Sequence, residues 1–67
     1  MDKNWVQVFE GTFLPLVEMY KAALETNNIP ALIFNQQDSV HKTFGEIKLY
    51  VNKDDLLKAL QIISTQD

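Results

Sequence analysis

Polar and apolar side chains alternate strictly over residues 46–51, and this pattern limits the folds open to the chain. Successive side chains of a β-strand point to opposite faces of a sheet, so a period of two predicts a strand that is buried on one face only. The apolar members, which are expected to face a core, are Ile47, Leu49 and Val51. The remaining side chains are left on an open face, as is common in antiparallel sheets.

Two further segments have the composition of strands. Residues 5–9 are rich in β-branched and aromatic side chains and are soon followed by Gly11, which is typical of a short strand that ends in a turn. Residues 31–34 form an unbroken apolar run directly after Pro30. The chain is therefore expected to contain three strands, of which 46–51 is the third.

A first amphipathic helix is predicted over residues 13–26. Its apolar side chains fall within an arc of about 120° at 3.6 residues per turn. Thr12 is expected to cap this helix, and Pro15 fits its first turn, where the missing N–H leaves no helical hydrogen bond unmade. The two asparagines at 27–28 can end the helix, because asparagine tolerates the left-handed conformation of a C-cap.

A second helix is expected to begin after Asn52, which forms a capping-box pattern with Asp55 three positions later. Asp54 and Asp55 supply the negative charge that the positive end of a helix dipole favours, which accounts for the pair better than acid–base chemistry does. The side chains that share the apolar face of this helix are Leu56, Ala59, Leu60 and Ile63.

These elements follow the order β-α-β-β-α within 67 residues, so a single domain spanning residues 1–67 is expected. A right-handed crossover between the first two strands puts the intervening helix on one face of the sheet, and the second helix is expected beside it. With the third strand between the other two, the prediction is an α+β fold. It is a ferredoxin-like half plait with a three-stranded antiparallel sheet and two helices on one face.

Charge and composition weigh against several classes of function. A net charge of −3 opposes binding to the phosphates of nucleic acids or to anionic lipid. With no cysteine and one histidine, the chain is expected to have no disulfide, metal site or cofactor. The longest unbroken apolar run, residues 31–34, is too short to span a membrane, and the first residues lack an export signal. We therefore expect a cytoplasmic protein that binds neither nucleic acid nor membrane.

The open face of the predicted sheet groups side chains that suit contact with another molecule. If Val6 and Val8 point toward the helices, alternation leaves the other side chains of the first strand on the open face, with two from the third strand. These residues are Trp5, Gln7, Phe9, Lys48 and Tyr50. The rings either shield the backbone of a partly exposed sheet or form a recognition surface. A homodimer through this face, or through the outer edge of the first strand, would supplement the small core.

A polar loop at residues 35–42 is a second candidate site, because loops carry function disproportionately. Its candidate binding residues are Gln36, Gln37, Asp38, Ser39 and His41. Three of them are the residue types of a hydrolase triad, but neighbours in one short loop do not readily adopt the geometry of a triad, and no enzyme activity is expected. The loop is either a solvated connection or a binding site for a small molecule or nucleotide.

Several motifs, spread over nearly the whole chain, resemble a known family. They are WVQVF at 5–9, GT at 11–12, LE at 24–25, NIPA at 28–31, NQQDS at 35–39, FGEIKLYV at 44–51 and LKA at 57–59. In these motifs the sequence resembles the small bacterial domain-of-unknown-function family labelled putative prokaryotic signal-transducing protein. The resemblance implies a fold similar to the PII-like and ferredoxin-like plaits, in a cytoplasmic protein without a known reaction. Members commonly have glycine where Asn28 stands here.

A shared fold does not transfer a function, so the prediction of function rests on the candidate surfaces. It is a non-enzymatic binding or regulatory module that acts in signal transduction through protein–protein contact, as a homodimer or with a protein partner. The alternative is a small-molecule or nucleotide sensor that uses the loop at 35–42.

Overall fold

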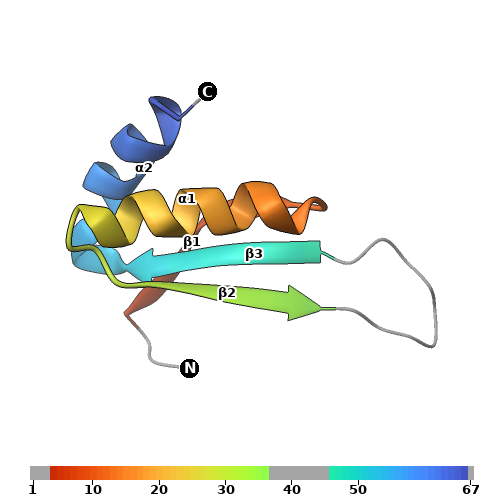
Figure 1. Cartoon of the computed structure of the whole chain (residues 1–67). Coiled ribbons are helices and arrows are strands. Elements are labelled where there is room, and N and C mark those ends of the chain that lie inside the picture. Colours follow the sequence, from red (N-terminus) through yellow and green to blue (C-terminus); the bar gives the residue numbers. More distant parts are fainter. Residues whose placement is uncertain (1–3, 37–45, 67) are drawn as a thin grey trace.

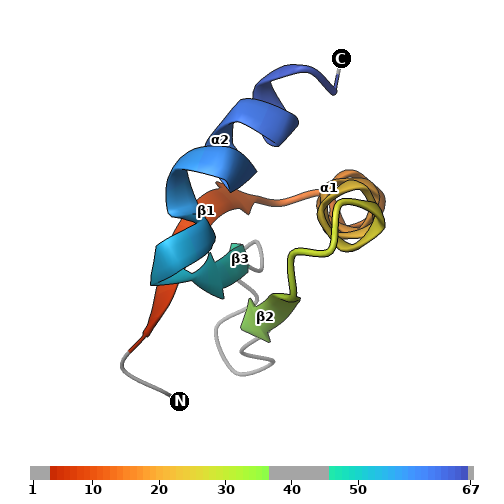
Figure 2. The ribbon, with the colours of Figure 1, turned by 90° about the vertical axis from the view of Figure 1, so that its left-hand side faces the viewer.

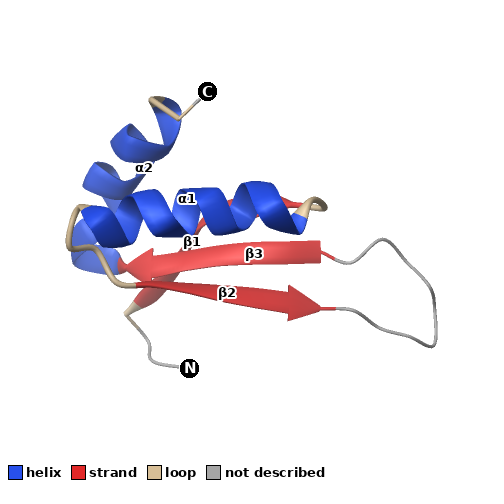
Figure 3. Ribbon diagram, in the orientation of Figure 1, coloured by secondary structure: helices blue, strands red, loops and turns tan. Residues whose placement is uncertain are grey.

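The computed structural model describes residues 4–36 and 46–66. Three strands and two α-helices lie in this part of the chain, with a short 3-10 helix, η1, before the second α-helix (Figure 1, Figure 3). In chain order they are β1 Trp5–Gly11, α1 Leu14–Thr26, β2 Ala31–Gln36, β3 Glu46–Asn52, η1 Lys53–Asp55 and α2 Leu56–Ser64. The predicted order β-α-β-β-α and the α+β class are confirmed.

The central strand of the sheet is β3, which lies between β1 and β2 and runs antiparallel to both. β1 and β2 are therefore parallel to each other, and α1 is the crossover that joins them across one face of the sheet. α2 lies on the same side of the sheet as α1, near β1 (Figure 2). The opposite face carries no described helix, as the half plait predicts.

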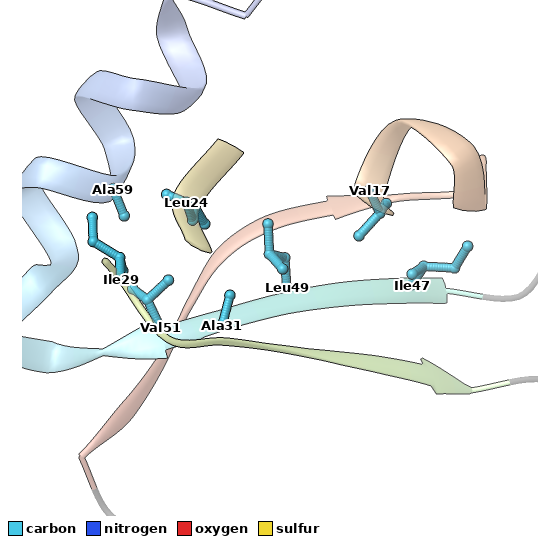
Figure 4. Close-up of a cluster of buried hydrophobic side chains, with 8 residues drawn as sticks. All are labelled: Val17, Leu24, Ile29, Ala31, Ile47, Leu49, Val51 and Ala59. Atoms are coloured by element: carbon cyan, nitrogen blue, oxygen red, sulfur yellow. The ribbon is translucent and has the colours of Figure 1, made fainter. Parts of the chain in front are cut away.

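One apolar cluster fills the space between the sheet and the helices (Figure 4). Its buried members are Val17, Leu24, Ile29, Ala31, Ile47, Leu49, Val51 and Ala59. The three from β3 are at most 4% exposed, so the predicted alternation along this strand is confirmed. No polar or charged side chain of the described residues is buried. The stability of this core therefore comes from apolar burial, at roughly 25 cal/mol per Å².

The C-terminal end of α1 confirms the predicted left-handed stop. Asn28 has a φ of 63°, and the N–H of Ile29 donates to the Leu24 carbonyl at 2.9 Å, while the N–H of Asn28 donates to the Glu25 carbonyl at 3.0 Å. These two bonds form a Schellman motif. In this motif an apolar contact normally joins the two residues of the bond that spans more of the chain, here Leu24 and Ile29. Leu24 and Ile29 are both buried in the core cluster, so this turn sets the direction in which β2 begins.

The start of α1 differs from the prediction that Thr12 caps it. The capping position is Phe13, with no side-chain capping bond, and its carbonyl accepts from the N–H groups of Leu16 and Val17 at 3.1 and 3.3 Å. Pro15 lies in the first turn, as predicted, and has no N–H that needs a partner. Phe13, the first residue of the predicted helix, lies just outside α1 and is 64% exposed.

The start of the C-terminal helical segment follows the prediction in part. The Asn52 side chain accepts a hydrogen bond from the N–H of Asp54 at 3.3 Å and so caps η1, which leads directly into α2. Along α2, Ala59 is buried and Ile62 and Ile63 pack on the core, whereas Leu60 is 43% exposed. Leu60 was predicted to face the core. α2 rises away from the sheet (Figure 1), and the residues of α2 in or against the cluster are Ala59, Ile62 and Ile63.

Candidate functional site

An irregularity in β1 determines which of its side chains reach the open face. Trp5 pairs with Asn52 and Gln7 with Tyr50, but the next pair is Phe9 with Leu49, so the register shifts between Gln7 and Phe9. Two residues of β1 thus oppose one residue of β3, which is the arrangement of a β-bulge. The residues of β1 that follow the bulge therefore lie on the opposite face from the one that simple alternation predicts.

The prediction that Phe9 lies on the open face is therefore wrong. Directly paired residues share a face of the sheet, and the partner of Phe9 is the fully buried Leu49. The Phe9 ring packs edge-on against Tyr20 of α1, with the ring centroids 4.8 Å apart and an interplanar angle of 84°. A Cβ on Gly11 would lie 2.9 Å from the Phe9 ring, so the glycine leaves the space that the ring fills.

The other four predicted residues lie on the open face. Gln7 and Tyr50 are direct partners, Trp5 pairs with Asn52, and Lys48 precedes Tyr50 by two residues along β3. Gln7 is exposed, whereas Trp5, Lys48 and Tyr50 are half-buried. Because of the bulge, the partner of Lys48 on this face is Glu10.

Two apolar residues of β2 complete the open face and were missed from the sequence. Leu32 pairs with Tyr50 and Phe34 with Lys48, and they are 44% and 42% exposed. The run of four apolar residues at 31–34 has no alternation that could assign a face to each member. Their face could have been predicted from β3, because pairing with a strand of known alternation assigns a face to every residue of the neighbouring strand.

We call this set of side chains the open-face surface, and it consists of Trp5, Gln7, Glu10, Leu32, Phe34, Lys48 and Tyr50. Its direct pairs form two rows across the sheet, one with Tyr50 at its centre and one with Lys48. Nζ of Lys48 lies 3.9 Å from Oε2 of Glu46 on the same strand, a pair that contributes little energy at a surface. The surface is thus an apolar and aromatic strip bordered by single charges of both signs.

The predicted loop site lies almost wholly outside the described residues. Gln36 ends β2 and pairs with Glu46. Gln37, Asp38, Ser39 and His41 lie outside the described residues. The binding role of this loop therefore stays a prediction.

Other chemistry finds little support in the described part of the chain. No group of three or more histidine, cysteine or acidic side chains there could hold a metal ion. A shallow hollow beside the turn after α1 is lined by Glu25, Asn28, Ile29 and Pro30. It combines one carboxylate and one amide with apolar side chains and groups no nucleophile with a base. None of the described helices is long and apolar enough to cross a membrane.

Comparison with known families gives a match that covers every described element. Residues 5–65 match the family described as putative prokaryotic signal transducing protein. The chain belongs to this family. The resemblance found in the sequence motifs is thus confirmed, and the description of the family assigns a signal transducing role without naming a partner, a ligand or a reaction. No curated protein and no solved structure gave a significant match to the chain.

Proposed function

We propose that this protein is a cytoplasmic, non-enzymatic binding module that acts in signal transduction by contacting another protein through the open-face surface. One observation carries the proposal: four apolar or aromatic side chains lie next to one another, by strand register, on the face of the sheet that no described helix covers. They are Trp5, Leu32, Phe34 and Tyr50. The family description, which names a signal transducing role, supports the same reading.

The composition of the open-face surface favours a protein partner. Aromatic side chains are enriched in protein–protein interfaces, because they bury a large area at a low cost in conformational entropy. Exposed apolar residues scattered singly are ordinary, whereas Leu32 and Tyr50 are direct neighbours, and so are Phe34 and the aliphatic stem of Lys48. Glu10 and Lys48 at this strip supply charges that can orient a partner and exclude like-charged ones.

Photo-crosslinking in cells of the source organism tests the proposal. Benzoylphenylalanine replaces Phe34, which it resembles in shape, and in a matched control it replaces Met19 of α1. Both native side chains are 42% exposed, so the two probes are equally accessible but lie on opposite sides of the sheet. We expect a cross-linked product with another protein from position 34 and none from position 19.

Competition decides whether that product is specific. An excess of the wild-type chain without benzoylphenylalanine should abolish the cross-linked product. An excess of the Trp5→Ser/Tyr50→Ser variant should not, since this variant lacks two rings of the open-face surface. Equal cross-linking from positions 34 and 19, or a product that no competitor removes, would refute a binding role for this face. A product of two copies of the 7.7 kDa chain is scored separately, because it reports self-association.

A further inference from the structure

The two edges of the sheet differ in how well they can accept another strand. β1 and β2 each have one described neighbour, β3, so each presents an outer edge. β1 is interrupted by the bulge at Val8 and carries the charge of Glu10. β2 pairs with β3 in unbroken register from Ala31 to Gln36, and its sequence, ALIFNQ, contains no charge.

This difference matters because the edge of a sheet offers backbone N–H and C=O groups to any strand that reaches it. Proteins usually protect such edges with charges, bulges or an inserted proline. β1 has two of these protections, whereas the only proline near β2 is Pro30, which precedes the strand. α1 packs on the face of β2 and β3, and none of the described helices or strands pairs with the outer edge of β2 (Figure 2). Of the two edges, β2 is the one suited to pairing.

We propose that the outer edge of β2 pairs with β2 of a second copy of this chain, antiparallel about a twofold axis, so that two three-stranded sheets join into one. A second copy fits because an uncharged strand can lie beside itself without placing like charges opposite each other. The mixed charges of the open-face surface also place no large patch of one sign beside the junction. This pairing does not depend on the partner proposed for the open face.

The faces of β2 fix the register of this pairing. Leu32 and Phe34 lie on the open face, whereas Ala31 and Ile33 lie on the helix side, where their β3 partners are buried. Directly opposed residues of a continuous sheet share a face, so an even-numbered residue must oppose an even-numbered one. Of the registers that satisfy this rule, the one with Ile33 on the twofold axis, opposite its own copy, pairs Leu32, Ile33 and Phe34 with one another and keeps residues 31–35 of both copies paired within β2.

In this register Leu32 of each copy lies opposite Phe34 of the other. These are the two described open-face residues of β2 that are large and apolar, 44% and 42% exposed in the single chain, and the pairing covers part of both. On the helix side the small Ala31 meets Asn35, and the two copies of Ile33 face each other at the axis. Pro30 has no N–H to donate and marks one end of the new ladder. The open-face surfaces of the two copies become continuous.

Two measurements on the wild-type protein test this dimer. Light scattering from about 10 μM to about 1 mM should show a mass rising toward twice 7.7 kDa. In a mixture of isotope-labelled and unlabelled chains, filtered NMR spectra should show contacts between Leu32 methyl groups of one copy and the Phe34 ring of the other. A mass that stays at 7.7 kDa over this range, or a dimer without these contacts, would overturn the proposal.

A matched pair of variants separates edge pairing from association through the open face. Phe34→Lys should raise the Kd of the dimer about tenfold, because both symmetry-related Leu32–Phe34 contacts are lost. Gln7→Lys adds the same charge to the same face on β1 and should leave the Kd unchanged. NMR spectra of each monomer confirm that it is folded. Equal weakening by both variants would assign the dimer to the open face and overturn the edge pairing.

Discussion

The two faces of the sheet are built from the same strands but differ in burial. Leu49 and Tyr50 are neighbours in β3, yet Leu49 is fully buried under the helices whereas Tyr50 is half-buried on a face without them. The helix side holds an apolar cluster with no buried polar side chain of the described residues. The open side mixes rings, aliphatic chains and charges. The difference teaches that a short domain can bury one face of its sheet and still leave rings and aliphatic chains exposed on the other.

The largest difference between the faces is expected at adjacent positions of β3. Leu49→Ala removes a fully buried side chain and should lower the free energy of unfolding by about 3 kcal/mol, most of the stability that a core of this size supplies. Tyr50→Ala should cost less than about 1 kcal/mol, because its ring is already in contact with water. Urea unfolding followed by circular dichroism measures both. Equal losses would mean that the open face also stabilises the fold.

The bulge in β1 predicts a second difference in stability between variants of the two faces, of intermediate size. Phe9→Ala should cost about 2 kcal/mol, because the ring packs on Tyr20 and on the core, although it is not fully buried. Trp5→Ala changes a larger ring on the open side and should cost less than about 1 kcal/mol. Thermal unfolding of the two variants gives the comparison. A larger loss from Trp5→Ala would contradict the exchange of faces at Val8.

A smaller effect is expected at the turn after α1, which leads into the edge strand β2. Asn28→Ala should cost about 1 kcal/mol, because alanine is strained at a φ of 63°. Asn28→Gly should be neutral or stabilising by up to about 0.5 kcal/mol, since glycine adopts this conformation freely. Chemical unfolding distinguishes the two. If alanine and glycine gave the same stability, the left-handed conformation would not be what asparagine supplies here.

The smallest effect on stability is expected from Lys48, one of the charges that border the apolar strip of the open face. Lys48→Gln breaks a surface ion pair with Glu46 and should change the free energy of unfolding by no more than about 0.5 kcal/mol. The same substitution should weaken binding of the proposed protein partner, and more so at low salt, where charges on a surface are least screened. Binding measured at two salt concentrations tests this. A large loss of stability would place Lys48 among the structural residues.

How far the sequence predicted the fold depended on how local each signal was. The alternation of residues 46–51 and the asparagine after α1 act through short-range geometry, so strand, core face and helix end were predictable. The element order then allowed few topologies, because crossovers are right-handed.

Three of the errors arose where contacts between elements determine the outcome. Nothing in residues 5–11 marks Val8 as the site of a bulge, and the face of Phe9 follows from that bulge. Leu32 and Phe34 acquire a face only through their partners in β3. Leu60 has the helical spacing of a core residue, but the tilt of α2 leaves it exposed. In each case the missing information was the position of another element.

The most direct test of the division between the faces is the unfolding of one variant in which the four apolar open-face residues are all polar. The substitutions are Trp5→Thr, Leu32→Thr, Phe34→Thr and Tyr50→Thr. Threonine keeps the preference for strands, so the variant should still unfold cooperatively, with a loss of no more than about 2 kcal/mol in urea. A variant that has lost cooperative unfolding would show that the open face is part of the core rather than a surface for contact.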